Sequence, residues 1–506
     1  HNPKAIMLKV FAWLWLSSSA LSFAPARHAV SARTPRGLAT QMQAAPTQAK
    51  GVVIVTPRAR ERAALVAAIG ENVVGSIVQG FGGGAGDSGA ALVDAEVVDV
   101  GALAGSKSVF FLFEEDGHLR KDVEEIRQAC RYTLFVPEAS APYRLESGGD
   151  RVLEATRLRF QALVEGAHGR GSESSTSLQA GQWSHFLSLT LPQVDDALAL
   201  MPQLRPGQDA LELRVDLLSD TSAPSLHRQM ALLKDLLGLP LVYTVRTRGQ
   251  IGRYPDEATG EIAGLLREGL RGGAEWLDVE GCLPDDLVDE LGSAVGGAYS
   301  TTSKLLGSLH TTSPQTEAQI EAMFAQCDLR GHAHMLKVVT GARAESADAD
   351  CARVHAVGAR QPKPYIGLCL GPAGALSRVL NRRFTPVTHE LLAAAAPGQL
   401  SAAQLMRRRL GAGLLAPRQF FLFGSPIQAS LSPTMHNNAY KALILPHTYG
   451  LSEHTEVGPY AALMADPSFG GASVTIPHKE SIMGLLDEVR GAALAIGAVN
   501  TVVVEG

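Results

Sequence analysis

One lysine of this sequence stands in an unusual position. Lys337 lies inside an apolar run of the stretch GHAHMLKVVTG (residues 331–341), with Leu336 before it and Val338 after it. Side chains alternate between the two faces of a strand, so Lys337 points away from both neighbours. Taken alone, the pattern fits a surface strand whose lysine is in water. The alternative is an interior lysine, because burial lowers the pKa of an amine and makes it a nucleophile.

Three further predicted strands carry polar side chains on one face or at their ends. In LELRVD, Glu212, Arg214 and Asp216 are two residues apart and therefore share a face. Arg246 lies near the end of VYTVRT, and His310 near the end of LLGSLHTT. Such charges fit a solvated strand, but in a parallel barrel both faces are covered and the charges must pair inside. A lone histidine is more often a core residue, yet four such strands in succession favour a site.

These residue types suit amine catalysis. A lysine amine attacks a carbonyl and forms a Schiff base, which acts as an electron sink so that a neighbouring proton can leave. Histidine supplies a general acid and base near neutral pH, and arginine binds a carboxylate through paired hydrogen bonds. No metal is expected, because the lysine iminium does the electrophilic work.

The runs that carry these residues recur regularly from Ser184 onward. Amphipathic stretches such as LHRQMALLKDLLG and TEAQIEAMFAQC separate strand-like runs, which are SHFLSLTL, ALELRVDLL, LPLVYTVRT, AEWLDVEG, LLGSLHTTS, HMLKVVTG and YIGLCLGP. Seven or eight strand and helix repeats predict an α/β fold, a parallel (β/α)8 TIM barrel. In such barrels the chemistry lies at the carboxyl ends of the strands, where Arg246 and His310 stand.

In their order and spacing these motifs resemble type I 3-dehydroquinate dehydratase over residues 184–411, with 27 residues from His310 to Lys337. The resemblance implies that Lys337 forms a Schiff base with 3-dehydroquinate and that His310 is the general acid and base. It implies substrate-binding roles for five further residues: Glu212, Arg214, Arg246, Arg378 and Gln399. Of these, Arg378 would bind the carboxylate and Gln399 would help close a lid.

Two positions depart from that family. Gln250 stands where many members have a glutamate that orients the histidine; a glutamine can hydrogen-bond an imidazole but cannot raise its pKa as a carboxylate does. Ala395 replaces a lid serine, so one substrate hydrogen bond is expected to be lost. The combination of YTVRT with a glutamine is similar to the dehydratase part of the pentafunctional arom polypeptide.

Two other functions stay open for the barrel. A class I aldolase-type Schiff-base lyase would need a phosphate site late in the barrel, where this sequence has LSR and APGQ. A non-catalytic metabolite sensor would bind 3-dehydroquinate without converting it. Retention of His310, Lys337 and Arg378 favours the enzyme.

A second group of motifs lies in residues 416–506. The segments SLSPTMHNNAY, VTIPHKE and AVNT resemble the substrate-binding domain of shikimate dehydrogenase. The resemblance implies that Lys479 is catalytic and that four residues bind 3-dehydroshikimate or shikimate: Ser430, Ser432, Thr475 and Asn500. Ser473 stands where that family usually has asparagine. The family's NADP-binding domain would follow Gly506, so NADP is expected for a longer protein and no cofactor for the dehydratase.

The amino-terminal residues predict a leader and a further domain. Residues 1–50 combine an apolar core with an acid-free stretch rich in Ala, Arg and Ser, as in a signal followed by a transit peptide. Cleavage before Phe23 and a plastid destination are expected, with a cytoplasmic location as the alternative. Residues 51–165 alternate strand and helix patterns and predict an α/β domain, kinase-like but without a phosphate-binding lysine, followed by a linker at 166–183.

Composition limits the partners. The net charge of -5 provides no basic field for nucleic acid, and five scattered cysteines indicate neither a disulfide framework nor a zinc site. We expect small-molecule substrates, no membrane contact in the mature protein and no metal. A homodimer stays open.

Overall fold

The structure is a computed structural model that describes residues 52–56, 91–94, 107–113, 119, 121–136, 159, 183–443 and 445–504. The predicted leader, the glycine-rich stretch 80–89 and nearly all of the predicted linker lie outside these residues. Within the described ranges, no helix has both the length and the apolar character needed to cross a bilayer.

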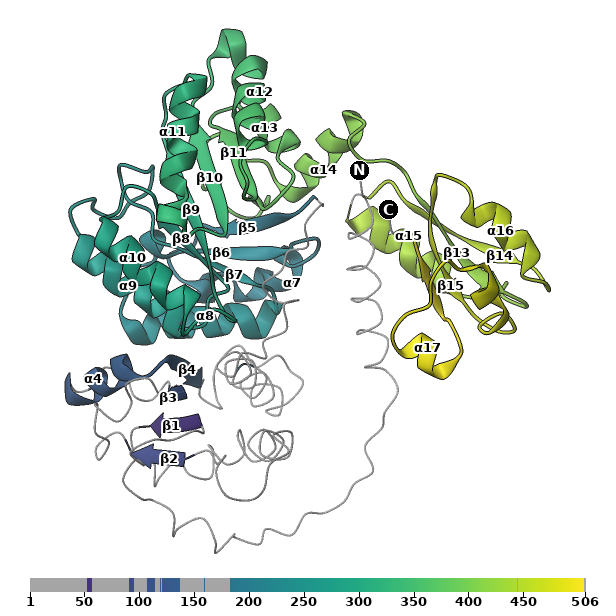
Figure 1. Cartoon of the computed structure of the whole chain (residues 1–506), viewed down its shortest axis with the longest axis horizontal. Helices are drawn as coiled ribbons and strands as arrows, with labels where there is room; N and C mark the ends of the chain where they lie inside the picture. The colour runs from purple at the N-terminus through teal and green to yellow at the C-terminus, as the bar shows by residue number, and fades with distance from the viewer. Residues whose placement is uncertain are drawn as a thin grey trace, which may run out of the picture.

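Eight parallel strands form the central sheet (Figure 1). Their order is β11-β10-β9-β8-β7-β6-β5-β12, so the last strand along the chain pairs with the first. The strands are β5 (His185–Leu189), β6 (Ala210–Arg214), β7 (Leu241–Thr244), β8 (Trp276–Glu280), β9 (Lys304–His310), β10 (Met335–Thr340), β11 (Tyr365–Cys369) and β12 (Thr385–Val387). The predicted TIM-like barrel is therefore confirmed, in a nearly closed form.

Helices connect the strands and cover the outside of the barrel. The α-helices are α7 (Met201–Leu204), α8 (Ala223–Leu237), α9 (Thr259–Arg271), α10 (Asp285–Gly296), α11 (Glu317–Cys327), α12 (Ala347–Gly358), α13 (Ala375–Leu380) and α14 (Ala402–Gly411). Short 3-10 turns are η4 (Val194–Leu200), η5 (Val215–Leu217), η6 (Leu329–Gly331) and η7 (Ala344–Ser346).

Two of these helices begin at reciprocal caps. At the start of α11, Thr316 accepts from the backbone of Gln319, whose side chain accepts from the backbone of Thr316. Ser401 and Gln404 make the same box at the start of α14. Such a box satisfies two of the four free amides of a helix start, so both helices begin at defined residues.

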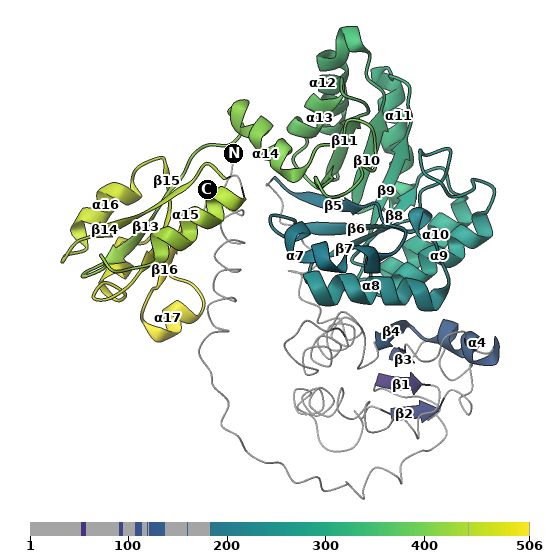
Figure 2. The same ribbon diagram turned by 180° about the vertical axis from the view of Figure 1, so that it is seen from behind.

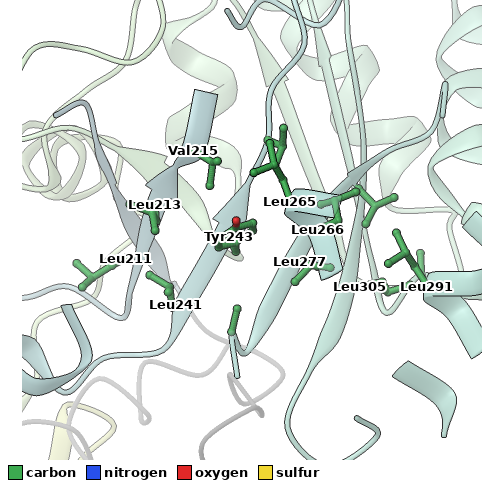
Figure 3. Packing of buried hydrophobic residues seen from close by; sticks show 14 of the residues in the cluster. Leu211, Leu213, Val215, Leu241, Tyr243, Leu265, Leu266, Leu277, Leu291 and Leu305 are labelled. Carbon is green, nitrogen blue, oxygen red and sulfur yellow. The ribbon is translucent and has the colours of Figure 1, made fainter. Parts of the chain in front are cut away.

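Residue alternation separates two cores in the barrel. Leu336 and Val338 of β10 pack with the leucines of neighbouring strands and helices between sheet and helices, and Figure 3 shows part of that layer. Met335 and Val339 point instead into the barrel, together with Phe186 of β5. Period-two alternation thus sends the polar residues of the same strands inward.

The amino-terminal part has a parallel sheet of its own, ordered β2-β1-β3-β4, and one described helix. The elements are β1 (Val52–Thr56), β2 (Ala91–Asp94), β3 (Lys107–Phe113), α4 (Lys121–Ala129) and β4 (Tyr132–Val136). An α/β arrangement is as predicted, and a kinase-like identity stays a prediction.

A buried ionic cluster joins this sheet to the barrel. Arg127 of α4 is fully buried and donates to Glu268 of α9 at 2.7 Å, and His227 of α8 lies 2.8 Å from the same carboxylate. Burial opposes ionisation, yet hydrogen bonds from His227 and Arg127 hold the pKa of Glu268 well below its usual range.

The carboxyl-terminal domain is a smaller sheet that follows α14 (Figure 2). Its strand order is β14-β13-β15-β16, and β16 runs antiparallel to β15. The elements are β13 (Gln419–Gly424), α15 (Ser432–Ala442), β14 (Thr448–Glu453), α16 (Gly458–Met464), β15 (Phe469–Val474), η8 (Ser481–Leu485), α17 (Ala492–Ile496) and β16 (Thr501–Val503).

Candidate active site

A small pocket of about 60 Å³ lies inside the barrel near the carboxyl ends of its strands. Its lining includes every barrel residue that was predicted to have a role: Glu212, Arg214, Arg246, His310, Lys337, Arg378 and Gln399. Seven side chains from positions as far apart as 212 and 399 therefore meet in one place. The two departures, Gln250 and Ala395, line it as well.

Lys337 points into this pocket from the middle of β10 and is only 4% exposed. Its Nζ donates to Asp278 of β8 at 2.9 Å and lies 5.8 Å from the centre of the Phe186 ring. The surface-strand interpretation is thus wrong. A buried ammonium needs a compensating charge, and Asp278 supplies it.

Arg246 shares this compensating charge. Its Nη1 donates to Glu280 at 2.9 Å and to Ser308 at 2.8 Å, and its Nη2 lies 2.7 Å from Asp278. Burial works against the cation, but Asp278 and Glu280 raise the pKa of Arg246 above its usual value. In turn Arg246, Lys337 and His310 hold the pKa of Asp278 well below its usual range, although burial alone would raise it.

The loop after β7 folds back over Arg246. The amides of Arg253 and Tyr254 both donate to the Arg246 carbonyl, and a Cβ on Gly252 would lie 2.1 Å from that oxygen. Glycine is therefore required there. The neighbouring Ile251, which lines the pocket, has φ = 70°, a left-handed conformation that is strained for a β-branched residue.

His310 is the last residue of β9 and is held through its backbone. Its amide donates to Oε1 of Gln250 at 2.6 Å, while its Nδ1 is buried with no hydrogen-bond partner in the described part of the chain. Gln250 therefore fixes the main chain of His310, and the expected contact between glutamine and imidazole does not form. Burial, and then Arg246 and Lys337, lower the pKa of His310 well below its usual value, so the ring is neutral at pH 7.

Arg378 brings an unpaired charge to the pocket from α13. It is 2% exposed, its Nη1 makes one long bond of 3.4 Å to the Pro386 carbonyl, and its Nε has no partner among the described residues. Burial lowers the pKa of Arg378 to about 10, which leaves it charged at pH 7. A buried guanidinium without a carboxylate is a ready receptor for an anion.

Glu212 and Arg214 occupy the pocket wall formed by β6. Glu212 accepts from the Thr244 hydroxyl at 2.9 Å, and Arg214 makes a paired bond to Asp216 at 2.8 and 2.7 Å. The strand ends at Arg214, so Asp216 lies in the 3-10 turn that follows rather than in the predicted strand. It still neutralises Arg214, as charges inside a barrel must.

Gln399 closes the pocket from the segment before α14. Its Oε1 accepts from the amide of Ala395 at 2.7 Å, and its Nε2 donates to Ser188 of β5 at 3.3 Å. The lid is thus fastened to the barrel by its own glutamine. Ala395 contributes a backbone amide where the family pattern has a hydroxyl.

The predicted residues of the carboxyl-terminal domain form two groups that lie closer to the surface than the barrel residues do. The Val474 amide donates to the Asn500 carbonyl and the Val499 amide to that of Lys479, which brings Lys479 and Asn500 beside the end of β15, where Thr475 follows. Ser430 and Ser432 form a separate pair with their hydroxyls 3.1 Å apart. Asn500 is exposed and the other four are half-buried.

Comparison with known families gives the same division. Residues 185–408 match the family model described as type I 3-dehydroquinase. The barrel is a type I 3-dehydroquinase domain. Residues 422–502 match the shikimate dehydrogenase substrate binding domain, so the dehydroquinase domain is followed by a domain of that second family.

Multidomain proteins are among the chain's relatives. This chain is 44% identical to the pentafunctional AROM polypeptide of Malassezia globosa over 328 residues, which cover 63% of the chain. It is 39% identical to the pentafunctional AROM polypeptide of Mycosarcoma maydis over 394 residues, which cover 74% of the chain. It spans only 20% and 22% of their lengths. The solved dehydroquinate dehydratase and shikimate dehydrogenase of S. pombe AroM is 35% identical, with a TM-score of 0.59, over 64% of this chain and 62% of that one.

Sequence reasoning missed two acidic residues of the dehydroquinase domain. Asp278 and Glu280 hold Lys337 and Arg246, yet only the basic partners were identified. A signal was present, because WLDVE places two charged side chains two residues apart at a strand end, as LELR does. Within the described residues no group of three or more His, Cys, Asp or Glu side chains is arranged to hold a metal.

Proposed function

We propose that the dehydroquinase domain dehydrates 3-dehydroquinate to 3-dehydroshikimate through a Schiff base on Lys337. The observation that carries this proposal is a single pocket holding a buried lysine, a neutral histidine and an unpaired arginine. The lysine attacks the substrate carbonyl and forms an iminium, which withdraws electrons. The histidine moves protons, and the arginine binds the substrate carboxylate.

The proposed reaction balances in four steps. The Lys337 amine adds to the C3 ketone, and the oxygen leaves as water after taking up one proton, which gives an iminium and is reversed on the final hydrolysis. Neutral His310 takes a proton from C2, and the electron pair flows into the iminium to form an enamine. The C1 hydroxyl then leaves as water with the proton that His310 returns, and a second water hydrolyses the iminium. The ionised Asp278, 2.9 Å from Nζ, stabilises the positive charge throughout.

The size of the pocket adds a requirement for movement. Its 60 Å³ is far below the roughly 300–1,000 Å³ of most small-molecule sites. Substrate entry therefore requires the Ala395–Gln399 segment to leave Ser188, which breaks one hydrogen bond of 3.3 Å. Closing again would exclude water from the iminium.

Borohydride reduction in the presence of 3-dehydroquinate tests the mechanism. Mass spectrometry should find the reduced adduct on Lys337, and an unmodified Lys337 in an active enzyme would rule the Schiff base out. Binding of 3-dehydroquinate without turnover would instead support the sensor function, and cleavage of a phosphorylated sugar the aldolase function.

For the second domain we infer shikimate or 3-dehydroshikimate as the ligand. The Ser430 and Ser432 hydroxyls suit one carboxylate, and Thr475, Lys479 and Asn500 suit ring hydroxyls and a carbonyl. Hydride transfer would require NADP, but no described element between β13 and β16 carries a glycine-rich phosphate-binding turn after a strand. Plastid targeting and a homodimer stay predictions.

A further inference from the structure

A second cavity of about 370 Å³ opens at the opposite end of the barrel. It lies where strands begin: Trp276 starts β8, Lys304 starts β9 and Met335 starts β10, while Phe384 directly precedes β12. None of its lining residues belongs to the pocket that contains Lys337. Its volume falls within the usual range for small-molecule sites.

A layer of aromatic side chains separates the two cavities. Trp276 packs against Phe384 at 5.2 Å between ring centres, and Phe384 against Phe186 at 5.8 Å. Phe186 in turn lies below the amine of Lys337. A ligand in the lower cavity would thus touch the underside of this layer without reaching the lysine.

The charged groups of the lower cavity are all basic. Lys304, Lys363 and Arg383 line it, and no acidic residue appears among the described lining residues. Lys363 is held by Asp328 at 2.5 Å and by the Gly331 carbonyl at 2.8 Å. The Arg383 guanidinium makes no side-chain hydrogen bond or ion pair to any described residue. Arg383 thus gives the cavity one positive charge that no described residue neutralises.

The neutral polar groups of the cavity also donate. Trp276 is 5% exposed, and its Nε1 has no hydrogen-bond partner among the described residues. The Nδ1 of His334 accepts from the Leu305 amide at 3.2 Å, so a neutral His334 carries its proton on Nε2. Burial, and then Lys304 and Lys363, lower the pKa of His334.

We propose that this cavity binds a small organic anion, an apolar ring or chain that carries one carboxylate or phosphate group. The oxyanion would accept from Arg383 and Lys363. Its apolar part would lie against Met335 and Phe384. This site is separate from the proposed reaction, since it shares no residue with that pocket.

Calorimetric titration of the full chain tests the proposal with benzoate, phenyl phosphate and neutral benzamide. The protein should carry Arg378→Ala, so that the arginine of the upper pocket cannot bind the test anion. We expect saturable binding of an anion below about 1 mM and at least tenfold weaker binding of benzamide. The tighter of the two anions identifies the group that the site prefers.

Arg383→Ala should weaken anion binding at least tenfold, and the matched control Arg382→Ala should leave it unchanged. Arg382 is its exposed neighbour, lies over Trp183 and does not line the cavity. Proton NMR of the His334 ring gives a local measurement, because an anion beside it should raise its apparent pKa. No saturation by about 10 mM, equal binding of benzamide, or equal effects of the two arginine variants would overturn the proposal.

Discussion

The barrel pocket encloses its polar side chains, whereas the second domain leaves its candidate residues half-buried or at the surface. Arg246, Asp278 and Lys337 are 1–4% exposed, and each charge is held by another. Around Lys479 and Asn500 water can solvate the polar groups, so no compensating network is needed. Enclosure thus fixes the protonation states of the barrel site and requires internal neutralisation, while the open cluster depends on the ligand to complete it.

Of the variants that distinguish the two sites, Lys337→Ala should cause the largest loss of activity. Removing the nucleophile should lower dehydration of 3-dehydroquinate by at least about a thousandfold, because no other described lysine lines the pocket. The rate is measured by the absorbance of the conjugated product. Lys479→Ala is the matched control and should leave dehydration unchanged, whereas similar losses in both variants would contradict separate sites.

Arg378→Met should lower kcat/KM for 3-dehydroquinate by more than about a hundredfold, equivalent to roughly 3 kcal/mol for a lost charged hydrogen bond. Its free energy of unfolding should not fall, because the variant removes a buried cation that lacks an anionic partner. Denaturant unfolding measures stability alongside the kinetics.

Arg409→Met is the contrasting variant. Arg409 is also fully buried, with its pKa lowered to about 9 by burial, but it donates to the carbonyls of Val379 and Asn381 and lies 4.2 Å from the Trp183 ring. Its loss removes these hydrogen bonds to buried carbonyls and its packing on Trp183, and should cost about 1–3 kcal/mol of stability. If Arg378→Met destabilises the protein as much as Arg409→Met, Arg378 is structural.

Ser432→Ala tests the open site and should have a smaller effect. Shikimate binding should weaken about tenfold, because the variant loses one hydrogen bond worth about 1.4 kcal/mol. The free energy of unfolding should change by less than about 0.5 kcal/mol. Calorimetry with shikimate measures the affinity. Thr455→Ala, at an exposed position of the same domain, should change neither quantity. A loss of stability on Ser432→Ala would show that this hydroxyl supports the fold.

The smallest expected effect is a fall in the rate of dehydration at acidic pH. His310 must be neutral to take a proton, and its pKa lies below the usual value, so kcat/KM should fall only below about pH 6.5. Gln250→Glu would place a negative charge beside the His310 amide and should move this limb to higher pH. An acidic limb at or above pH 6.5 in the unmodified enzyme would contradict the lowered pKa.

Strand patterns and motif order were sufficient to predict the barrel and seven residues of its pocket. They missed β12, because TPV is only three residues long and contains a proline, which strand patterns exclude. Its place depends on Asn381 and Ser184, which hydrogen-bond the backbone and side chains around Thr385 and Phe384. The bond from the Phe384 amide to Ser184 crosses 200 residues of chain and leaves no local pattern.

The sequence alone determined the fold class, the order of the domains and the inward direction of Lys337, because period-two alternation and motif spacing are local properties. The tertiary structure decided which charges pair: Asp278 with Lys337 and Arg246, Gln250 with a backbone amide, and Arg378 with no acidic partner in the described chain. Ion pairing depends on distances between strands far apart in the chain and on burial, and only the folded barrel sets both.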